Sequence, residues 1–131
     1  MAATVVSASQ KMDVANQPCN KSKNRYETIT PFDNNRVQLA KLLNTDGSDY
    51  INASYIDTYT EKKSFIATQA PLVGTVADFW RMVYEAESWV IVLLGQEIEK
   101  GQVLHLSLMV CFCDVIINLS LLIVKEGRVK T

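Results

Sequence analysis

The chain has 131 residues, 48% of them hydrophobic, which suits a single domain with a core of its own. Its formal net charge of -1 and its scattered basic residues argue against nucleic acid as a partner. Three cysteines without regular spacing, and a start that lacks the charged, apolar and small-residue series of a leader, predict a cytoplasmic location for the body of the chain.

The beginning of the chain has few sustained patterns. Residues 1–22 are mostly small and polar and predict a flexible lead-in, assigned to residues 1–19, or a weak first helix. Two turns follow, because TPFDNNRV at residues 30–37 and NTDGSD at residues 44–49 are rich in turn formers. In the second turn, Gly47 supplies the residue that tolerates a positive φ. Short strands are expected between and after these turns.

Three segments have the composition of short strands. DYINASYI at residues 49–56 and SFIATQA at residues 64–70 are rich in β-branched and aromatic residues and are bounded by turn formers. WVIVLL at residues 89–94 is a continuous apolar run of strand length. Such a run predicts a strand that is buried on both faces of a sheet.

One segment, GTVADFWRMVYEAES at residues 74–88, predicts a helix. Its larger apolar side chains recur with the helical period and fall on one face: Val76, Phe79, Trp80, Val83 and Tyr84. Thr75, followed three residues later by Asp78, predicts a capping box that fixes the start of the helix. The aromatic stripe is typical of a helix that packs on a sheet.

The segment CNKSKNR, from Cys19 to Arg25, has the cysteine and arginine spacing of a loop that forms a phosphocysteine. Such a loop surrounds a phosphate with backbone N–H groups and one guanidinium, while a thiolate of lowered pKa attacks the phosphorus. Here the segment has no glycine, no Ser or Thr directly after Arg25, and no helical pattern beyond it. We therefore interpret Cys19 as an incidental cysteine in a basic loop.

Four motifs occur in series: KNRYETITPFDNNRV at residues 23–37, DYINASYI, FIATQAP at residues 65–71 and TVADFWRMV at residues 75–83. In this order and spacing they closely resemble the N-terminal half of a tyrosine-specific protein phosphatase domain of the receptor type. The resemblance extends over residues 20–102 and implies a truncated α/β domain with a partial mixed sheet and one clear helix. It also implies hydrolysis of protein phosphotyrosine through a phosphocysteine intermediate, without a cofactor.

The resemblance assigns roles to several residues. Tyr26 matches the family's substrate-recognition tyrosine, whose ring packs against phosphotyrosine and sets the depth of the pocket; the alternative is a tyrosine that covers the sheet edge. Thr28 stands where the family commonly has an Asp or Asn that holds the substrate backbone, so a phosphotyrosyl protein is expected to bind weakly. Asn52 and Gln69 match scaffold amides that join backbone segments. Glu99 matches a glutamate that orients the catalytic arginine, with a solvated turn residue as the simpler interpretation.

After Gln102 the resemblance stops. The family's general-acid loop and its His-Cys-(five residues)-Arg loop have no counterpart here, and neither Cys111 nor Cys113 has an arginine six residues later. We therefore assign no catalytic residue. His105 and Asp114 do not complete a metal site with the two cysteines, because no second pair supplies four ligands, so no metal site is assigned either.

The tail at residues 103–131 is strongly apolar, and three interpretations of it stay open. Residues 103–124 are long enough to span a membrane, although Asp114 near the centre costs about 2.5–3.5 kcal/mol on insertion scales. Alternatively, residues 103–110 and 115–124 form two strands that turn at CFCD and cover the truncated sheet. The abruptness of the break favours the third interpretation, a tail unrelated to the domain, from an alternative exon or a gene-model error.

The sequence thus predicts a lead-in at residues 1–19, a partial tyrosine-phosphatase domain at residues 20–102 and a divergent hydrophobic tail at residues 103–131. Because the thiolate, the phosphate-binding arginine and the general acid are missing from this pattern, the chain alone is expected to be inactive as a phosphatase. The alternatives are a non-catalytic module that binds phosphotyrosine or pairs with an intact phosphatase domain, and a membrane-anchored truncated product.

Overall fold

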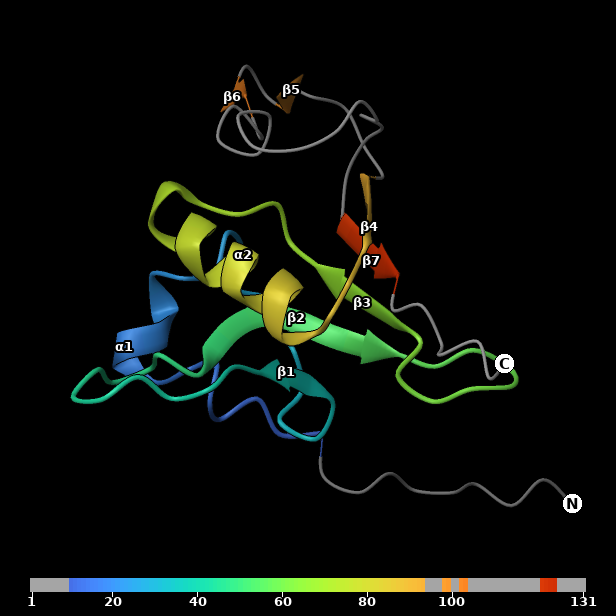
Figure 1. The fold of residues 1–131 in the computed structure, drawn as a ribbon. Coiled ribbons are helices and arrows are strands. Elements are labelled where there is room, and N and C mark those ends of the chain that lie inside the picture. Colours follow the sequence, from blue (N-terminus) through green and yellow to red (C-terminus); the bar gives the residue numbers. More distant parts are fainter. Residues whose placement is uncertain (1–9, 94–97, 100–101, 104–120, 125–131) are drawn as a thin grey trace, which may run out of the picture.

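The computed structural model describes residues 10–93, 98–99, 102–103 and 121–124, and its body is a five-stranded sheet with one longer helix lying along it (Figure 1). The elements in chain order are α1 (Pro18–Lys21), β1 (Arg36–Gln38), β2 (Tyr50–Ile56), β3 (Phe65–Thr68), the 3-10 turn η1 (Val73–Thr75), α2 (Val76–Glu85), β4 (Val90–Leu93), β5 (Ile98–Glu99), β6 (Gln102–Val103) and β7 (Leu121–Val124). Within the described ranges, the short strands β5 and β6 form a separate two-stranded sheet.

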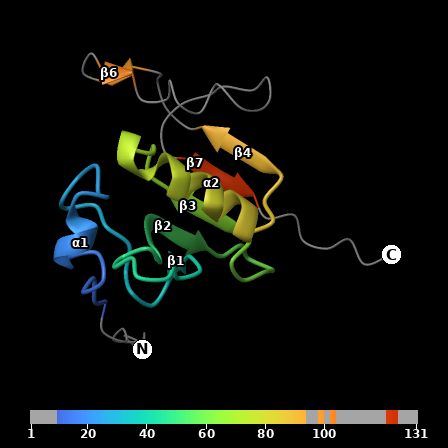
Figure 2. The ribbon, with the colours of Figure 1, turned by 60° about the vertical axis from the view of Figure 1, so that its left-hand side comes forward.

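The strand order of the main sheet is β1-β2-β3-β7-β4, and the neighbouring pairs are antiparallel. β7 lies between β3 and β4, with Ile123 opposite Ile66 on one side and Ile91 on the other (Figure 2). β3 and β4 therefore run parallel to each other and are linked through η1 and α2. The predicted α/β class is confirmed, with the tail strand separating the two parallel strands.

The predicted strands and turns before α2 are found close to their expected places. Residues 49–56 and 64–70 contain β2 and β3, which pair in register with Ser54 opposite Ala67. In the turn at residues 44–49, Gly47 has a φ of 68°, as its place after Asp46 predicts. The first half of the sheet thus follows from local composition.

Helix α2 supplies the core with side chains that pack on the sheet. Phe79 and Met82 are almost fully buried. The core cluster consists of Val37, Leu39, Ile51, Ala53, Ile66, Phe79, Met82 and Ala86. The prediction was wrong for Tyr84, which is 84% exposed, because a residue five positions after Phe79 lies about 140° around the helix. Met82, which the sequence pattern did not include, lies about 60° from Phe79 on the buried side of the helix.

The predicted capping box of α2 is also wrong, although Thr75 is the N-cap residue. Its hydroxyl accepts from the N–H of Leu72 (2.8 Å) and donates to the carbonyl of the same residue (3.2 Å). The η1 turn brings this backbone within reach of Thr75, so no bond to the first turn of α2 forms. The Asp78 carboxylate is bonded instead to Lys23 (2.9 Å), which belongs to another part of the chain.

The apolar run at residues 89–94 forms β4, but its expected burial on both faces is wrong. Trp89 is 80% exposed and Val90 is 47% exposed, while Ile91 packs against the core. The reason is that Ile91 lies on the face of the sheet against which α2 packs, whereas Val90 points to the opposite face and Trp89 precedes the strand.

The tail contributes β7 and one residue of β6, Val103, to the described part of the molecule. β7 falls within the predicted strand at residues 115–124, whereas residues 104–110 and the turn at CFCD lie outside the described residues. In the ranges that the structure describes, none of the helices is long and apolar enough to cross a membrane. The three-part division of the chain stays a prediction.

The residues before α1 contact the turn that precedes β1. The Asp33 carboxylate accepts from the N–H groups of Asp13 (2.9 Å) and Val14 (3.1 Å). Ala15 is buried, and its carbonyl accepts from the side chain of Asn24 (3.3 Å). Residues near the end of the predicted lead-in are therefore attached to the domain, close to the loop that carries the candidate site.

Candidate functional site in the tyrosine loop

The residues that the sequence singles out for substrate recognition lie on residues 23–29, which we call the tyrosine loop. The loop follows α1 and precedes the turn before β1. Tyr26 is 41% exposed and Ile29 is 66% exposed, and Thr28 is exposed as well. An aromatic ring, a hydroxyl and an aliphatic side chain are therefore accessible to solvent on one short segment.

Gln69, directly after β3, fixes the first half of the tyrosine loop. Its Nε2 donates to the Lys23 carbonyl (2.7 Å), and its Oε1 accepts from the N–H of Arg25 (2.8 Å). The two bonds bracket Asn24, so one side-chain amide holds the backbone immediately before Tyr26. Because Gln69 directly follows β3, which lies in the interior of the sheet, its two bonds fix the position of the loop relative to that strand.

Asn52, on β2, closes the loop from the other side. This buried side chain donates through Nδ2 both to Oδ1 of Asn24 (3.0 Å) and to the carbonyl of Ile29 (2.8 Å). One amide nitrogen therefore binds the chain before and after Tyr26. The prediction that Asn52 and Gln69 join backbone segments is confirmed by these bonds.

Tyr50 adds a third bond beneath the loop. Its ring is fully buried, and its hydroxyl donates to Oδ1 of Asn24 (2.6 Å). Burial raises the pKa of Tyr50 to about 12. The hydroxyl therefore stays protonated and remains a donor at neutral pH.

Cys19 and Arg25, the pair with phosphocysteine-like spacing, have separate surroundings. Cys19 is exposed within the four-residue helix α1. The Arg25 guanidinium donates through Nε to the carbonyl of Ala70 (3.1 Å) and through Nη2 to that of Pro71 (3.1 Å). Its donors thus bind the chain after β3 and stabilise the loop, which agrees with the interpretation of Cys19 as incidental.

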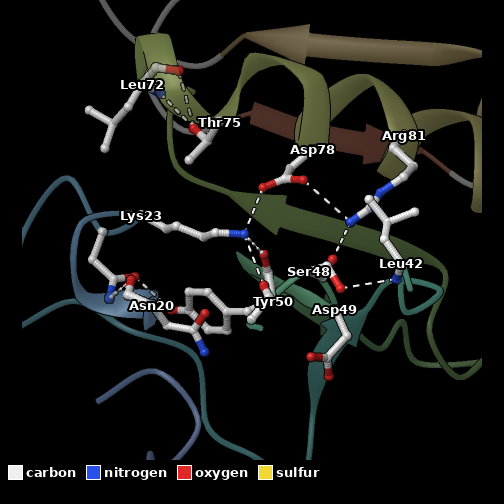
Figure 3. A network of polar contacts seen from close by, with 12 residues as sticks. Asn20, Lys23, Leu42, Ser48, Asp49, Tyr50, Leu72, Thr75, Asp78 and Arg81 are labelled. Atoms are coloured by element: carbon white, nitrogen blue, oxygen red, sulfur yellow. Dashed lines mark hydrogen bonds and ion pairs between the residues drawn. The ribbon is translucent and has the colours of Figure 1, made fainter. Parts of the chain in front are cut away.

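A network of charged side chains joins the loop to α2 (Figure 3). The Lys23 ammonium donates to Oδ2 of Asp78 (2.9 Å), and Oδ1 of the same carboxylate accepts from Arg81 (3.3 Å). Sequence reasoning missed this network. The spacing of Asp78 and Arg81 by three residues on a helix was a usable signal for one pair, whereas nothing local indicates Lys23 as a partner.

Other residues considered from the sequence cannot be placed in this site. Glu99 lies on β5, and its side chain is outside the described part. His105, Cys111, Cys113 and Asp114 also lie outside the described residues. Within the described ranges, no group of three or more His, Cys, Asp or Glu side chains is arranged to hold a metal ion.

The described residues thus form an α/β domain in which two side-chain amides, one on β2 and one directly after β3, clamp a loop that carries an exposed tyrosine. The family model described as Protein-tyrosine phosphatase matches residues 20–106. The chain belongs to the protein-tyrosine phosphatase family and is a fragment of such a domain, similar to those of receptor-type members.

Three relatives illustrate the similarity. Over 89 residues the chain is 52% identical to phosphatidylinositol phosphatase PTPRQ of Rattus norvegicus, a match that covers 68% of this chain and 4% of the relative. It is 50% identical over 88 residues to receptor-type tyrosine-protein phosphatase S of Gallus gallus, covering 67% and 6%. It is 50% identical over 94 residues to tyrosine-protein phosphatase Lar-like of Caenorhabditis elegans, covering 72% and 4%. The chain thus spans a small part of the length of these relatives.

Proposed function

We propose that this chain is a non-catalytic phosphotyrosine-binding fragment of a phosphatase domain, located in the cytoplasm. The observation that carries the proposal is the tyrosine loop, in which an exposed Tyr26 lies between two anchored segments. Because the backbone is bound on both sides of Tyr26, the loop loses little conformational freedom when a second ring stacks on this tyrosine. Stacking of this kind contributes about 0.5–1.5 kcal/mol, so a phosphotyrosyl side chain is a weak ligand with Tyr26 as its platform.

Thr28 limits the strength of that binding. It is exposed two residues after Tyr26, at the position where the resemblance places an Asp or Asn that holds the peptide backbone. A hydroxyl makes a neutral hydrogen bond, whereas an ionised carboxylate makes a charge-assisted bond of roughly twice the strength. We therefore assign Thr28 a weak contact with the peptide backbone.

Hydrolysis requires a thiolate nucleophile, an arginine around the phosphate and a proton donor for the leaving group. Arg25 donates to two backbone carbonyls, so it is poorly suited to receive a phosphate near Cys19. Cys111 and Cys113 lack an arginine six residues later. The proposal is therefore binding without turnover.

The first test is a titration of the full chain with a phosphotyrosyl peptide, with the unphosphorylated peptide as a control. We expect Tyr26→Ala to weaken binding about two- to twelvefold, the loss of a stacking contact, and Thr28→Asp to strengthen it. Tyr59→Ala is the matched control, because Tyr59 is a fully exposed tyrosine between β2 and β3. Equal affinities of the wild type and Tyr26→Ala would contradict the proposal.

A second test addresses turnover. The chain, purified free of host phosphatases, is expected to release no phosphate from the same peptide above the level of a buffer control. Release that disappears in Cys19→Ser would show that Cys19 is a nucleophile after all. Because the PTPRQ relatives are named phosphatidylinositol phosphatases, a soluble inositol phosphate is added as a competitor. We expect it to displace the phosphotyrosyl peptide poorly, since it offers no aromatic ring to Tyr26.

A further inference from the structure

The Lys23 side chain is unusually well satisfied for a lysine at the surface of a small domain. Its ammonium donates to the carbonyls of Gly47 (2.9 Å) and Tyr50 (3.3 Å) and to Oδ2 of Asp78 (2.9 Å), which uses all three of its donors (Figure 3). The side chains of Lys23 and Asp78 are each 18% exposed. The ion pair is therefore largely removed from solvent and is screened less than a surface pair.

The Asp78 carboxylate, on α2, also binds a second cation, the guanidinium of Arg81. Arg81 donates through Nη2 to Oδ1 of Asp78 (3.3 Å) and to the carbonyl of Ser48. Its side chain is 19% exposed. The Asp78 carboxylate thus lies between two cations, and each cation also binds the backbone between Gly47 and Tyr50.

The turn whose carbonyls accept from Lys23 and Arg81 is tightly packed around Gly47. Gly47 has a φ of 68°, and a Cβ at this position would overlap the side-chain amide oxygen of Asn20. Asn20 is itself fully buried and donates to the carbonyl of Val14 (2.9 Å). The turn at Gly47 is therefore packed between α1 on one side and the cations of the network on the other.

The network connects α2 to the tyrosine loop by a short path. Lys23 is the first residue of the loop, and its carbonyl is held by Gln69 while its ammonium is held by Asp78. Displacement of the ammonium is therefore expected to shift the Lys23 backbone as well. The carbonyl of this backbone binds Gln69, and Lys23 lies three residues before Tyr26. Neutralising Asp78 leaves the Lys23 ammonium without its counter-ion in a poorly solvated place, whereas Arg81 keeps an ion pair with Glu85 (3.8 Å), so Lys23 is expected to rearrange to recover solvent.

We propose that Asp78 is a positioning residue for the tyrosine loop: through Lys23 it holds the loop in the conformation in which Tyr26 meets a phosphotyrosyl ring. The inference rests on the proposed function for its effect on binding. Its effect on the loop itself can be measured without a ligand.

The test substitutes Asp78→Asn in the full chain, which removes the charge and keeps the shape. We expect the dissociation constant of the phosphotyrosyl peptide to rise about fivefold. In a Tyr26→Ala background the same substitution is expected to have almost no further effect, because Asp78 acts through Tyr26. The control is Asp57→Asn, the same change in an exposed ion pair with Lys62 (2.7 Å). A full effect of Asp78→Asn in the Tyr26→Ala background would overturn the inference.

Amide hydrogen exchange provides the readout without a ligand. The N–H of Arg25 donates to Gln69, and that of Ile29 donates to the Tyr26 carbonyl (3.3 Å), so both report on the loop. We expect Asp78→Asn to accelerate exchange at both amides about fivefold and to leave the amide of Ile66 in β3 unchanged. Unchanged exchange at Arg25 and Ile29 would overturn the inference.

Two further outcomes are separable. If the wild type binds no phosphotyrosyl peptide, the proposed function fails, and the exchange rates alone decide whether Asp78 positions the loop. If Asp78→Asn does not fold, Lys23→Gln tests the same pair from the other side, because it removes the charge and keeps donors for the carbonyls of Gly47 and Tyr50. We expect Lys23→Gln to reproduce the exchange change and Lys23→Arg to restore wild-type rates.

Discussion

The tyrosine loop and strand β7 are held by their neighbours in different ways. Asn52 on β2 and Gln69 directly after β3 each make two hydrogen bonds to the loop, three of them to its backbone and one to the side chain of Asn24. In contrast, β7 pairs through its backbone with β3 on one side and β4 on the other. Order at the loop thus depends on individual polar atoms, whereas order around β7 depends on an uninterrupted ladder of backbone bonds.

This difference matters for function, because the contacts of the tyrosine loop tolerate few chemical changes and the ladder of β7 tolerates many side chains. Replacing an amide that binds two backbone groups leaves both groups unpaired, which costs about 1–3 kcal/mol for each buried group. A side-chain exchange in a strand keeps the ladder as long as the backbone N–H is retained. The following substitutions test this contrast from the largest expected effect to the smallest.

The largest effect is expected for Leu122→Pro in β7. Proline removes an N–H from a strand with neighbours on both sides and clashes with the ladder, so we expect the free energy of unfolding to fall by at least about 2 kcal/mol. Chemical denaturation followed by circular dichroism measures the change. The control is Tyr59→Pro, in the fully exposed bend between β2 and β3. Equal losses for the two proline variants would show that the β7 ladder contributes nothing.

A smaller loss of unfolding free energy is expected for Gly47→Ala, in the turn that accepts a hydrogen bond from Lys23. The positive φ of 68° and the overlap of a Cβ with the Asn20 amide both oppose the substitution, and we expect a loss of about 1–3 kcal/mol. Gly74→Ala is the matched control, since a Cβ at Gly74 meets no atom within 4 Å. The measurement is the midpoint temperature of thermal unfolding of each variant, compared with that of the wild type. A loss in Gly74→Ala as large as that in Gly47→Ala would refute the steric explanation.

The smallest effect at neutral pH is expected for Tyr50→Phe, which keeps the buried ring and removes the bond to Asn24. We expect a loss of about 0.5–1.5 kcal/mol, because Oδ1 of Asn24 keeps the bond from Asn52.

The same substitution has a signature in alkaline solution. The pKa of Tyr50 is raised to about 12 in the folded chain, above its value in the unfolded chain. Its stabilising contribution is therefore complete below about pH 10 and is lost as the pH rises from 10 to 12. Denaturation at several pH values should show this decline in the wild type and a shallower one in Tyr50→Phe. Parallel curves for the two proteins would contradict the assignment to Tyr50.

Sequence patterns located β2, β3 and α2 because each signal there is local: β-branched composition, turn formers and a helical period. They failed where the outcome depends on distant neighbours. The hydroxyl of Thr75 bonds to Leu72 because the η1 turn places that backbone beside it, and Val90 is exposed because it lies on the face of β4 opposite to Ile91 and α2.

The same distinction applies to the candidate site. Tyr26, Thr28, Asn52 and Gln69 could be named from the motifs that resemble a known family, and the hydrogen bonds of the two amides agree with that assignment. Lys23 and Asp78 could not be paired in advance, because they are 55 residues apart and neither of the local patterns that contain them indicates the other as a partner. A tertiary contact of this kind becomes visible only in the folded chain.

The central place of β7 has a consequence for how the chain is made. A ribosome synthesises β3, α2 and β4 well before it reaches Leu121–Val124, so the nascent domain has two strands in place while the strand between them does not yet exist. Such open strand edges attract other chains, and pairing between distant segments is slow. The emerging polypeptide is therefore expected to depend on chaperones until residue 124 has been added, and its yield in cells to depend on how fast that last strand docks.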